Sequence, residues 1–277
     1  MRDLKGKLAV VTGGASGIGE AIAEVFVEAG MHVVVADIEA KKAEAVAARH
    51  AKPGIRCVGM GVDVAQGESV RALAERCARE LGNVHVLCNN AGVLLMGPQA
   101  DMIAGDWRWT FDVNVLGVAH GLEHFLPRMR AHCERTGEPA HVVNTASVTG
   151  LRGASGTFVY SATKAAVLSI SESLREELAG TPIGVSVVLP SDIRSQIVAS
   201  QRNRPAETGR AYKQSVDPEV AAKHGLSPRA VGLHVRDAIL NDHFYVFTLP
   251  ASSAPANRAV IEGRTKELLE ALERGIV

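Results

Sequence analysis

The chain has 277 residues, 47% of them hydrophobic and 22% charged, so it can bury a large core and does not have the composition of a disordered protein. Thirty basic residues balance thirty acidic ones, and this parity argues against a nucleic-acid-binding protein. The apolar runs have only the length of strands, and the charged start MRDLKGKLAVVTGG does not resemble a signal peptide, so we expect a cytoplasmic protein with no membrane-spanning helix.

Short runs rich in β-branched residues alternate along the chain with Ala-, Glu- and Arg-rich segments of helical composition. The runs are LAVVTG (8–13), HVVVAD (32–37), RCVGMGVDV (56–64), VHVLCNN (84–90), HVVNTAS (141–147), VSVVLP (185–190) and FYVFTL (244–249). Apolar strands that alternate with helices are typical of a parallel sheet covered on both faces. The sequence therefore predicts one doubly wound α/β domain over residues 1–277, with a seven-stranded parallel sheet.

The first run leads into TGGASGIGE, a glycine-rich turn at the start of an expected helix. Glycines let the backbone turn sharply and approach a ligand, and the free N–H groups at a helix N-terminus favour a pyrophosphate. The second run ends in Asp37, 18 residues after Gly19. That offset is close to the one at which a carboxylate binds the adenosine ribose of a dinucleotide. Together these features predict dinucleotide binding.

The same carboxylate indicates which dinucleotide binds. Asp37 can accept hydrogen bonds from two ribose hydroxyls but repels a 2′-phosphate. Positions 16 and 38, where a basic residue would neutralise that phosphate, hold Ser16 and Ile38. The sequence therefore favours NAD over NADP as the cofactor.

Cysteine and histidine positions give no metal-binding pattern. The four cysteines are scattered without a C-x-x-C pair. His120 and His124 lie one helical turn apart, but no acidic or cysteine partner follows at a recognisable ligand spacing. We expect no metal site.

Further polar residues follow in chain order and include a Tyr-x-x-x-Lys pair. Tyr160 and Lys164 would share one face of a helix, because residues four apart on a helix are neighbours. The others are Asp63, the NNAG segment at 89–92, Asn114 and Ser147. Each alone has a structural reading as a turn residue, a cap or a buried amide. Their joint order, with the spacing T-G-x-x-x-G-x-G at 12–19, resembles the short-chain dehydrogenase/reductase family over almost the whole chain.

The resemblance implies a Rossmann-type fold and a catalytic set of Asn114, Ser147, Tyr160 and Lys164. Tyr160 would exchange a proton with a substrate alcohol while a hydride passes to the nicotinamide, and Lys164 would lower the pKa of the phenol and hold the nicotinamide ribose. Ser147 would hydrogen-bond the reacting oxygen, and Asn114 would hold a water that links Lys164 to solvent. The implied cofactor contacts are Gly13, Ser16, Gly17, Ile18, Gly19, Asp37, Ile38, Asp63, Val64, Asn90, Ala91, Gly92, Tyr160, Lys164, Pro190, Ile193 and Ser195.

The chain departs from the family pattern after the sixth run. The family reads Pro-Gly-x-x-x-Thr, whereas this chain reads PSDIRS at 190–195. Ser195 keeps a hydroxyl, but Ser191 would be strained if it kept the positive φ that glycine adopts easily. Asp192 adds an acid near the site with no role that the sequence assigns.

An apolar pocket suited to a hydrophobic secondary alcohol or ketone is expected beside the tyrosine. Its candidate lining residues, any of which could equally be ordinary core, are Leu94, Leu95, Met96, Ala154, Phe158, Ile193 and Ile197. The segments PSDIRSQI and HGLSP also resemble, faintly, a branch that oxidises benzylic alcohols of lignin-type aryl ethers.

Residues 191–228 interrupt the alternation of strands and helices and are predicted to form a substrate lid. Its middle, SQRNRPAETGRAYKQ (200–214), is polar and is expected to bury little apolar surface and to order on ligand binding. The alternative is an insertion packed permanently on a neighbouring subunit.

Two further expectations concern the protein as a whole. The helices that carry Asn114 and Tyr160 have more apolar positions than one buried stripe requires, and the resemblance implies a homotetramer assembled through them. The predicted function is an NAD-dependent oxidoreductase acting on a small hydrophobic alcohol or ketone. A non-catalytic NAD-sensing regulatory protein on the same fold is the alternative.

Overall fold

The computed structural model describes residues 1–217, 219 and 225–274. Seven parallel strands form one sheet in the order β3-β2-β1-β4-β5-β6-β7, which confirms the seven strands and the doubly wound α/β fold predicted from the sequence. The strands are β1 (Leu8–Thr12), β2 (His32–Asp37), β3 (Cys57–Gly61), β4 (Val86–Asn89), β5 (Ala140–Thr145), β6 (Ile183–Pro190) and β7 (Tyr245–Thr248). The order reverses between β1 and β4, which opens a crevice at the carboxyl ends of these two strands.

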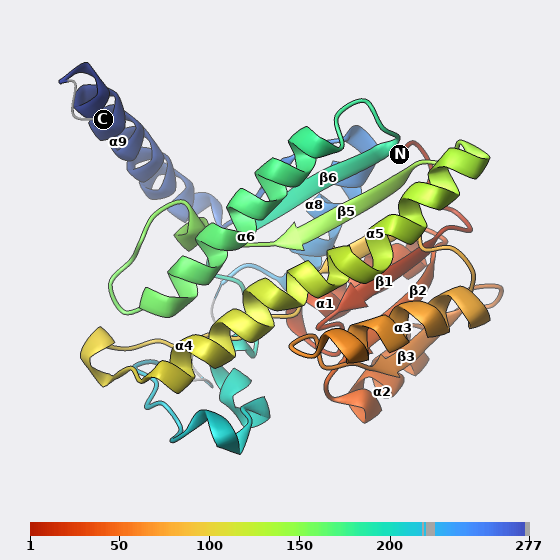
Figure 1. Ribbon diagram of the computed structural model, residues 1–277, viewed down its shortest axis with the longest axis horizontal. Helices are drawn as coiled ribbons and strands as arrows, with labels where there is room; N and C mark the ends of the chain where they lie inside the picture. The colour runs from red at the N-terminus through yellow and green to blue at the C-terminus, as the bar shows by residue number, and fades with distance from the viewer. Residues whose placement is uncertain (218, 220–224, 275–277) are drawn as a thin grey trace.

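Helices cover both faces of this sheet (Figure 1). The helices are α1 (Gly17–Glu28), α2 (Ala40–His50), α3 (Gly67–Glu80), α4 (Ala104–Phe111), α5 (Gly117–Thr136), α6 (Phe158–Glu177), α8 (Pro228–Asn241) and α9 (Ala254–Glu273). Short helical turns are η1 (Gln99–Asp101), η3 (Val148–Gly150), η4 (Ile197–Asn203), η5 (Ala206–Thr208) and η6 (Ala251–Ser253), and η2 (Asp112–Leu116) is a π-helical turn. Within the described ranges, no helix combines the length and apolar character needed to cross a membrane.

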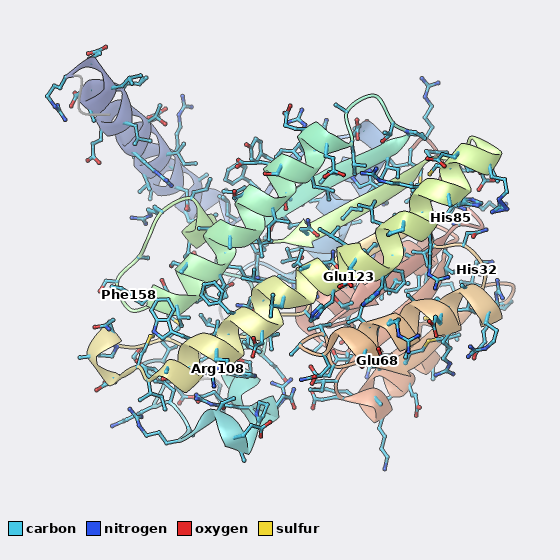
Figure 2. All side chains as sticks on the ribbon, viewed as in Figure 1. His32, Glu68, His85, Arg108, Glu123 and Phe158 are labelled. Carbon is cyan, nitrogen blue, oxygen red and sulfur yellow. The ribbon has the colours of Figure 1, made fainter. Side chains whose placement is uncertain are left out.

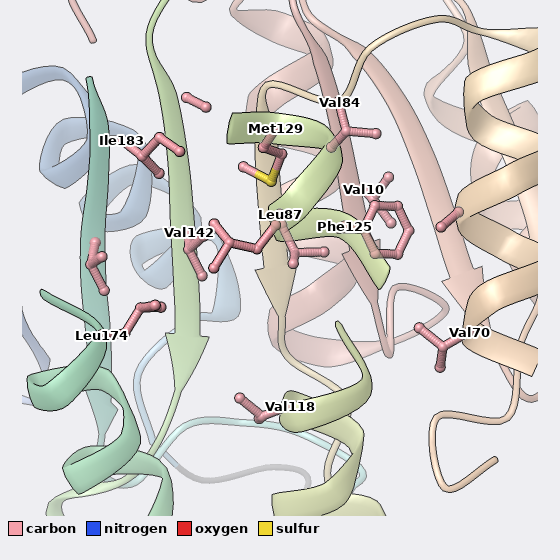
Figure 3. Packing of buried hydrophobic residues seen from close by; sticks show 14 of the residues in the cluster. Val10, Val70, Val84, Leu87, Val118, Phe125, Met129, Val142, Leu174 and Ile183 are labelled. Carbon is pink, nitrogen blue, oxygen red and sulfur yellow. The ribbon is translucent and has the colours of Figure 1, made fainter. Parts of the chain in front are cut away.

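Alternation along each strand divides the core into two layers. Val10 of β1 and Val142 of β5 face α3, α5 and α6, whereas Val11 and Val143, the next residues along, face α1, α2 and α8. In the first layer Phe125 and Met129 of α5 lie against Leu87 and Val142 of the sheet (Figure 3). Each such fully buried side chain stabilises the fold by about 1.5–3 kcal/mol. The two layers fix the sheet rigidly, so its carboxyl edge can hold a defined site.

Candidate active site

One cavity of about 690 Å³ lies at the carboxyl ends of the strands. Every cofactor residue predicted from the sequence lines this cavity, and so do Ser147, Tyr160 and Lys164. Asn114 is buried but is not among the lining residues. The structure therefore gathers nearly all of the predicted site residues, although they come from segments spread over most of the chain.

The glycine-rich turn forms the wall of the cavity at the start of α1. Gly13 has φ +63°, and a Cβ at this position would lie 2.7 Å from Ala91 Cα. A Cβ on Gly19 would lie only 2.1 Å from the Gly13 carbonyl oxygen. Larger residues would therefore clash within the turn itself or with the 90–92 segment. The positive end of the α1 dipole and its free N–H groups face the cavity, an arrangement that favours an anionic group.

Asp37 lies at the end of β2, at one end of the cavity, and its carboxylate is 8% exposed. Its Oδ2 accepts a hydrogen bond from Ala15 N at 3.0 Å, and its Oδ1 accepts one from Glu39 N at 3.0 Å. These two bonds hold the carboxylate beside the glycine-rich turn. Each oxygen keeps further acceptor capacity, which suits a ligand that carries two neighbouring hydroxyls.

The segment after β4 is fastened to the end of β1 by Asn90 and Thr12. Asn90 Nδ2 donates to Thr12 O at 3.0 Å, and Asn90 N and Ala91 N donate to Thr12 Oγ1 at 3.0 and 3.2 Å. After β3, Asp63 Oδ1 accepts from Ala65 N at 3.0 Å, which shapes the turn that brings Val64 to the cavity. The hydrogen bonds between Asn90 and Thr12 thus hold the ends of β1 and β4 together at the crevice.

Ser147, Tyr160 and Lys164 form a buried group farther along the cavity. Tyr160 is 9% and Lys164 2% exposed, and both lie on α6, as the four-residue spacing predicted. Lys164 Nζ lies 5.6 Å from the centre of the Tyr160 ring and donates to Thr145 O at 2.8 Å. The Ser147 hydroxyl is held by a hydrogen bond from Thr149 N at 3.2 Å. A phenol, an ammonium and a hydroxyl therefore meet beside the same cavity.

Burial has opposite effects on the two titratable groups. It raises the pKa of Tyr160 from 10.0 to about 12, and the neighbouring Ser147 hydroxyl opposes this shift. It lowers the pKa of Lys164 from 10.5 to about 8. The sequence predicted that Lys164 would lower the pKa of the phenol. In the protein alone the shift has the opposite direction, because desolvation of the buried phenolate outweighs the other influences.

The shifted pKa of Lys164 predicts a measurable effect on stability. Because the folded state favours the neutral amine, charged Lys164 opposes folding below about pH 8. This unfavourable contribution to the free energy of folding decreases between about pH 8 and 10.5, where Lys164 is still protonated only in the unfolded chain. Lys164→Met should therefore unfold in urea with a free energy at least equal to the parent's near pH 7, and higher by up to roughly 3 kcal/mol. The difference in unfolding free energy between the variant and the parent should become smaller toward pH 10. A Met variant that is less stable than the parent at pH 7 would contradict this.

Asn114 lies in the π-helical turn η2, between α4 and α5. Its Oδ1 accepts from Val93 N at 2.8 Å, and its Nδ2 donates to Val93 O and to Thr163 Oγ1, both at 3.0 Å. These contacts tie the segment after Gly92 to α6, so Asn114 positions the wall of the cavity. The water that the resemblance places between Asn114 and Lys164 stays a prediction.

The departure from the family pattern at 190–195 has a different consequence from the one expected. Ser191 does not adopt a positive φ, and its N–H donates to Thr248 O at 3.0 Å, which prolongs the sheet. The positive φ, +49°, falls on Asp192. Aspartate adopts this conformation more readily than most residues. Ser191 does not keep the positive φ that would have strained it, and Asp192 adopts it instead at the start of the predicted lid.

Residues of the predicted lid line the cavity, and two of its arginines form ion pairs with other parts of the chain. Arg202 Nη2 of η4 lies 2.8 Å from Glu39 Oε2, two residues after Asp37. Two residues farther along the lid, Arg204 Nη1 lies 2.5 Å from Asp106 Oδ1 on α4, with both side chains almost fully buried. Of the predicted range 191–228, residues 218 and 220–224 lie outside the described residues.

The middle of the lid buries more than its polar sequence suggested. Tyr212 is 3% exposed and packs with Val93, Leu95, Trp109 and Val159. Gln214 also accepts from Met96 N at 2.6 Å and donates to Leu94 O at 2.9 Å. The expectation that residues 200–214 have little to bury is therefore wrong. These contacts are made within the chain.

The part of the cavity beside Tyr160 is apolar, as predicted, but not every predicted residue contributes to it. Val198 packs on Leu94 and Tyr160, with Met96, Ile197 and Val216 around them. Leu95 lies in the core, and Phe158 is 52% exposed at the start of α6 (Figure 2). Neither of these two lines the cavity, and Ala154 does not line it either.

Sequence reasoning missed the contribution of α4 and of the lid's polar residues. Arg108, Trp109 and Asp112 line the cavity, as do Gln196 and Ser200. Arg108 is labelled in Figure 2 at the same end of the molecule as Phe158. These residues belong to no motif, and only the contact between the lid and α4 brings them to the site. No pattern along the chain could have identified them.

The structure also brings together a histidine cluster that the sequence did not suggest. His85 and His132 each place Nε2 against Glu138 Oε2, at 2.9 and 3.1 Å. Each Nδ1 faces a donor, Leu8 N for His85 and the Arg135 guanidinium for His132. Each Nε2 therefore carries the proton, whereas a metal ligand would need a free lone pair there. His120 and His124 do not belong to this cluster.

Comparisons with known proteins agree with this geometry. Residues 7–206 match the family model for short chain dehydrogenases. C alpha-dehydrogenase of Sphingobium sp. (strain NBRC 103272 / SYK-6) is 33% identical over 256 residues, 90% of this chain and 83% of the relative. 1-deoxy-11-beta-hydroxypentalenate dehydrogenase of Streptomyces exfoliatus is 34% identical over 247 residues, 88% of this chain and 84% of that one.

Among solved structures, a short chain dehydrogenase/reductase from Burkholderia phymatum in complex with NAD superimposes with a TM-score of 0.87. The two proteins are 34% identical, and the match covers 97% of this chain and 96% of the other. The fold, the motifs and these matches agree over nearly the whole length. The chain belongs to the short-chain dehydrogenase/reductase family of oxidoreductases.

Proposed function

We propose that this protein is an NAD-dependent oxidoreductase that interconverts a hydrophobic secondary alcohol and its ketone. One observation carries the proposal. The buried group of Ser147, Tyr160 and Lys164 lines the same cavity as the glycine-rich turn and Asp37, so a bound dinucleotide and an alcohol could meet there. A non-catalytic NAD sensor, the alternative, would have no need for that group.

The cavity walls fit NAD. The close approach of Gly13, Gly19 and Ala91 leaves backbone rather than side chains against a ligand, which suits a pyrophosphate at the start of α1. Asp37 offers acceptors for the two hydroxyls of the adenosine ribose. At the other end, Lys164 would hold the nicotinamide ribose, and Pro190, Ile193 and Ser195 would surround the carboxamide.

In the proposed reaction Tyr160 accepts the alcohol proton as the carbinol hydride leaves, and it returns that proton in the reduction. Ser147 donates a hydrogen bond to the reacting oxygen and holds it beside the phenol. When bound, the oxidised nicotinamide accepts the hydride, and its positive charge favours the phenolate. Lys164 adds positive charge whenever it is protonated. These charges would counter the rise that burial causes in the pKa of Tyr160.

We propose an aryl-substituted secondary alcohol as the substrate class. The apolar surface of Leu94, Met96, Ile197 and Val198 suits a flat hydrophobic group next to Tyr160. The relative from Sphingobium, a C alpha-dehydrogenase, supports dehydrogenation as the reaction. A panel of aryl and alkyl secondary alcohols, each incubated with NAD and followed by the absorbance of the reduced cofactor, would test the class. Turnover of alkyl alcohols alone would overturn it.

Asp37→Ala should weaken NAD binding by about 10- to 100-fold, because it removes charge-assisted hydrogen bonds worth roughly 1.5–3 kcal/mol. It should also narrow the preference for NAD over NADP, since the carboxylate that repels the 2′-phosphate is gone. Calorimetric titration of both nucleotides measures the two changes. General damage to the site would weaken both nucleotides alike, so the ratio of the two affinities is the decisive readout.

Glu39→Gln is the matched control, because it removes a carboxylate two residues away that pairs with Arg202 instead of facing the glycine-rich turn. It should leave the ratio of NAD to NADP affinity within about threefold of the parent's. A parent protein that binds NADP more tightly than NAD would contradict the role proposed for Asp37.

We further propose that the chain works as a cytoplasmic homotetramer whose lid, near 191–228, controls access to the site. The exposed apolar side chains of Leu116 and Phe158, 44% and 52% exposed, support assembly through the helices that carry Asn114 and Tyr160. The Arg202–Glu39 and Arg204–Asp106 ion pairs, which join the lid to the segment after β2 and to α4, support its role as a cover for both cofactor and substrate.

A further inference from the structure

The last helix, α9, extends away from the body of the molecule (Figure 1). It has 20 residues, and none of those in the described part of the helix is buried. Figure 2 shows its side chains projecting into open space on all sides. Most helical stability in proteins comes from packing of an apolar face, and α9 buries no residue against the rest of the described chain. We therefore expect α9 to pack against a partner surface.

The sequence of α9 provides such a face. Ile261, Leu268 and Leu272 follow one another at intervals of seven and four residues, so they form a narrow stripe along one side, with Leu269 beside it. These leucines are 55–60% exposed, and Ile261 is 36% exposed. Three leucines and an isoleucine left in water on one helix are typical of a protein–protein contact.

The charges of α9 run against its own dipole. Arg258, Arg264 and Lys266 lie in the first two thirds of the helix with one acid, Glu262, whereas Glu267, Glu270 and Glu273 lie in the last third, so the first part carries a net positive and the last part a net negative charge. The first turn holds no acidic residue and the last turn no basic one. An isolated helix is stabilised by the opposite arrangement, with acids at its N-terminus and bases at its C-terminus. Within the helix Arg258 pairs with Glu262 and Lys266 with Glu270, and a partner of complementary charge would stabilise the net charge that remains on each part.

We propose that α9 is a self-association helix that pairs antiparallel with α9 of a second copy of this chain. A two-fold axis between Lys266 and Glu267 would set Ile261 against the partner's Leu272, and Thr265 against the partner's Leu268. The apolar stripe would then be covered along its length. The basic part of each helix would lie beside the acidic part of the other, while a parallel pair would set like charges together.

The α9 contact would be separate from the tetramer contact proposed through α5 and α6. It also does not depend on the catalytic proposal, because α9 contributes no residue to the cavity. A copy that loses its activity could still pair through α9. The test of the contact can therefore use any folded form of the full-length protein.

Disulfide trapping tests the antiparallel register directly. In the double variant Ile261→Cys/Leu272→Cys, the two new thiols of one chain lie about 16 Å apart along the helix and cannot bond to each other. In the proposed pair each faces its counterpart on the second copy. Mild oxidation at low micromolar concentration should therefore give a covalent dimer on a non-reducing gel. The parent, whose cysteines are buried or half-buried, should stay monomeric on the same gel.

The single variants distinguish the alternatives. Neither Ile261→Cys nor Leu272→Cys alone should cross-link, because equivalent positions in an antiparallel pair are far apart. A dimer from one cysteine would show a parallel pair, and no dimer from the double variant would show that α9 does not pair with itself. Either result overturns the proposal.

A further substitution in the double-cysteine background tests the stripe. Leu268→Lys would place a charge in the seam of each helix and should reduce the covalent dimer at least tenfold. Ala259→Lys adds the same charge on the opposite face and should leave the yield within about twofold. Equal yields from these two variants would contradict pairing through the stripe.

Discussion

Replacing Tyr160 with phenylalanine should lower turnover of the alcohol by about 1,000-fold, because general acid–base catalysis contributes roughly 100- to 10,000-fold. The ring of Tyr160 is 9% exposed and packs on Leu94 and Val198, and phenylalanine keeps that packing while it removes only the hydroxyl. Steady-state rates of NAD reduction, with saturating alcohol, measure the loss. The dissociation constant of NAD should stay within about threefold of the parent's, since the phenol hydroxyl is not what holds the cofactor.

Val159→Leu is a matched control for the packing of this helix, because Val159 is fully buried next to Tyr160 but lies in the core cluster with Trp109. It should cost some stability, about 1–3 kcal/mol, while its folded fraction keeps a turnover within tenfold of the parent's. If Tyr160→Phe also stayed within tenfold of the parent, a barrier change below about 1.4 kcal/mol, Tyr160 would not be the proton acceptor.

Replacing Arg204 with alanine should destabilise the fold by about 3–5 kcal/mol, the cost of leaving a buried charge without its partner. Arg204 and Asp106 are 4% and 1% exposed, and the guanidinium also donates to the Thr208 carbonyl and lies over the Trp109 ring. The loss of this pair should release the lid from α4. Urea unfolding measures the stability, and the KM for the alcohol should rise with it because the lid residues line the substrate end of the cavity.

Arg202→Ala is the control for Arg204→Ala. Arg202 lies two residues earlier in the same lid, and its ion pair with Glu39 is about one third exposed on each side. An exposed pair contributes about 0–1 kcal/mol, so this variant should unfold almost as the parent does. Equal destabilisation by the two alanine variants would show that burial of the Arg204–Asp106 pair does not anchor the lid.

The sheet and most of the site could be predicted because their determinants are local. A β-branched run such as HVVVAD specifies its own strand, and the Tyr-x-x-x-Lys spacing places Tyr160 and Lys164 on one face whatever surrounds the helix. The glycine-rich turn is partly local, since Gly13 has a positive φ and Gly19 lies against the Gly13 carbonyl, although the close approach of Gly13 to Ala91 is a contact between distant segments.

The features that could not be predicted arise from contacts between distant segments. Tyr212 is one apolar residue in a polar stretch, and the surface that buries it comes from residues far earlier in the chain, among them Trp109 and Val159. The pKa of Tyr160 depends on how much water the fold excludes, which spacing does not reveal. Ser191 has no positive φ and continues the sheet with Thr248 of β7, while the positive φ lies at Asp192, and the sequence pattern does not reveal either feature.

Transfer of a labelled hydride tests the central claim most directly. The protein would be incubated with NAD and a 1-aryl secondary alcohol that carries deuterium on its carbinol carbon, and the mass of the reduced cofactor would be measured. The proposal predicts that the reduced cofactor carries one deuterium, formed by the parent and not by Tyr160→Phe. Binding of NAD without any reduced cofactor across the alcohol panel, or reduced cofactor that lacks the deuterium, would contradict it.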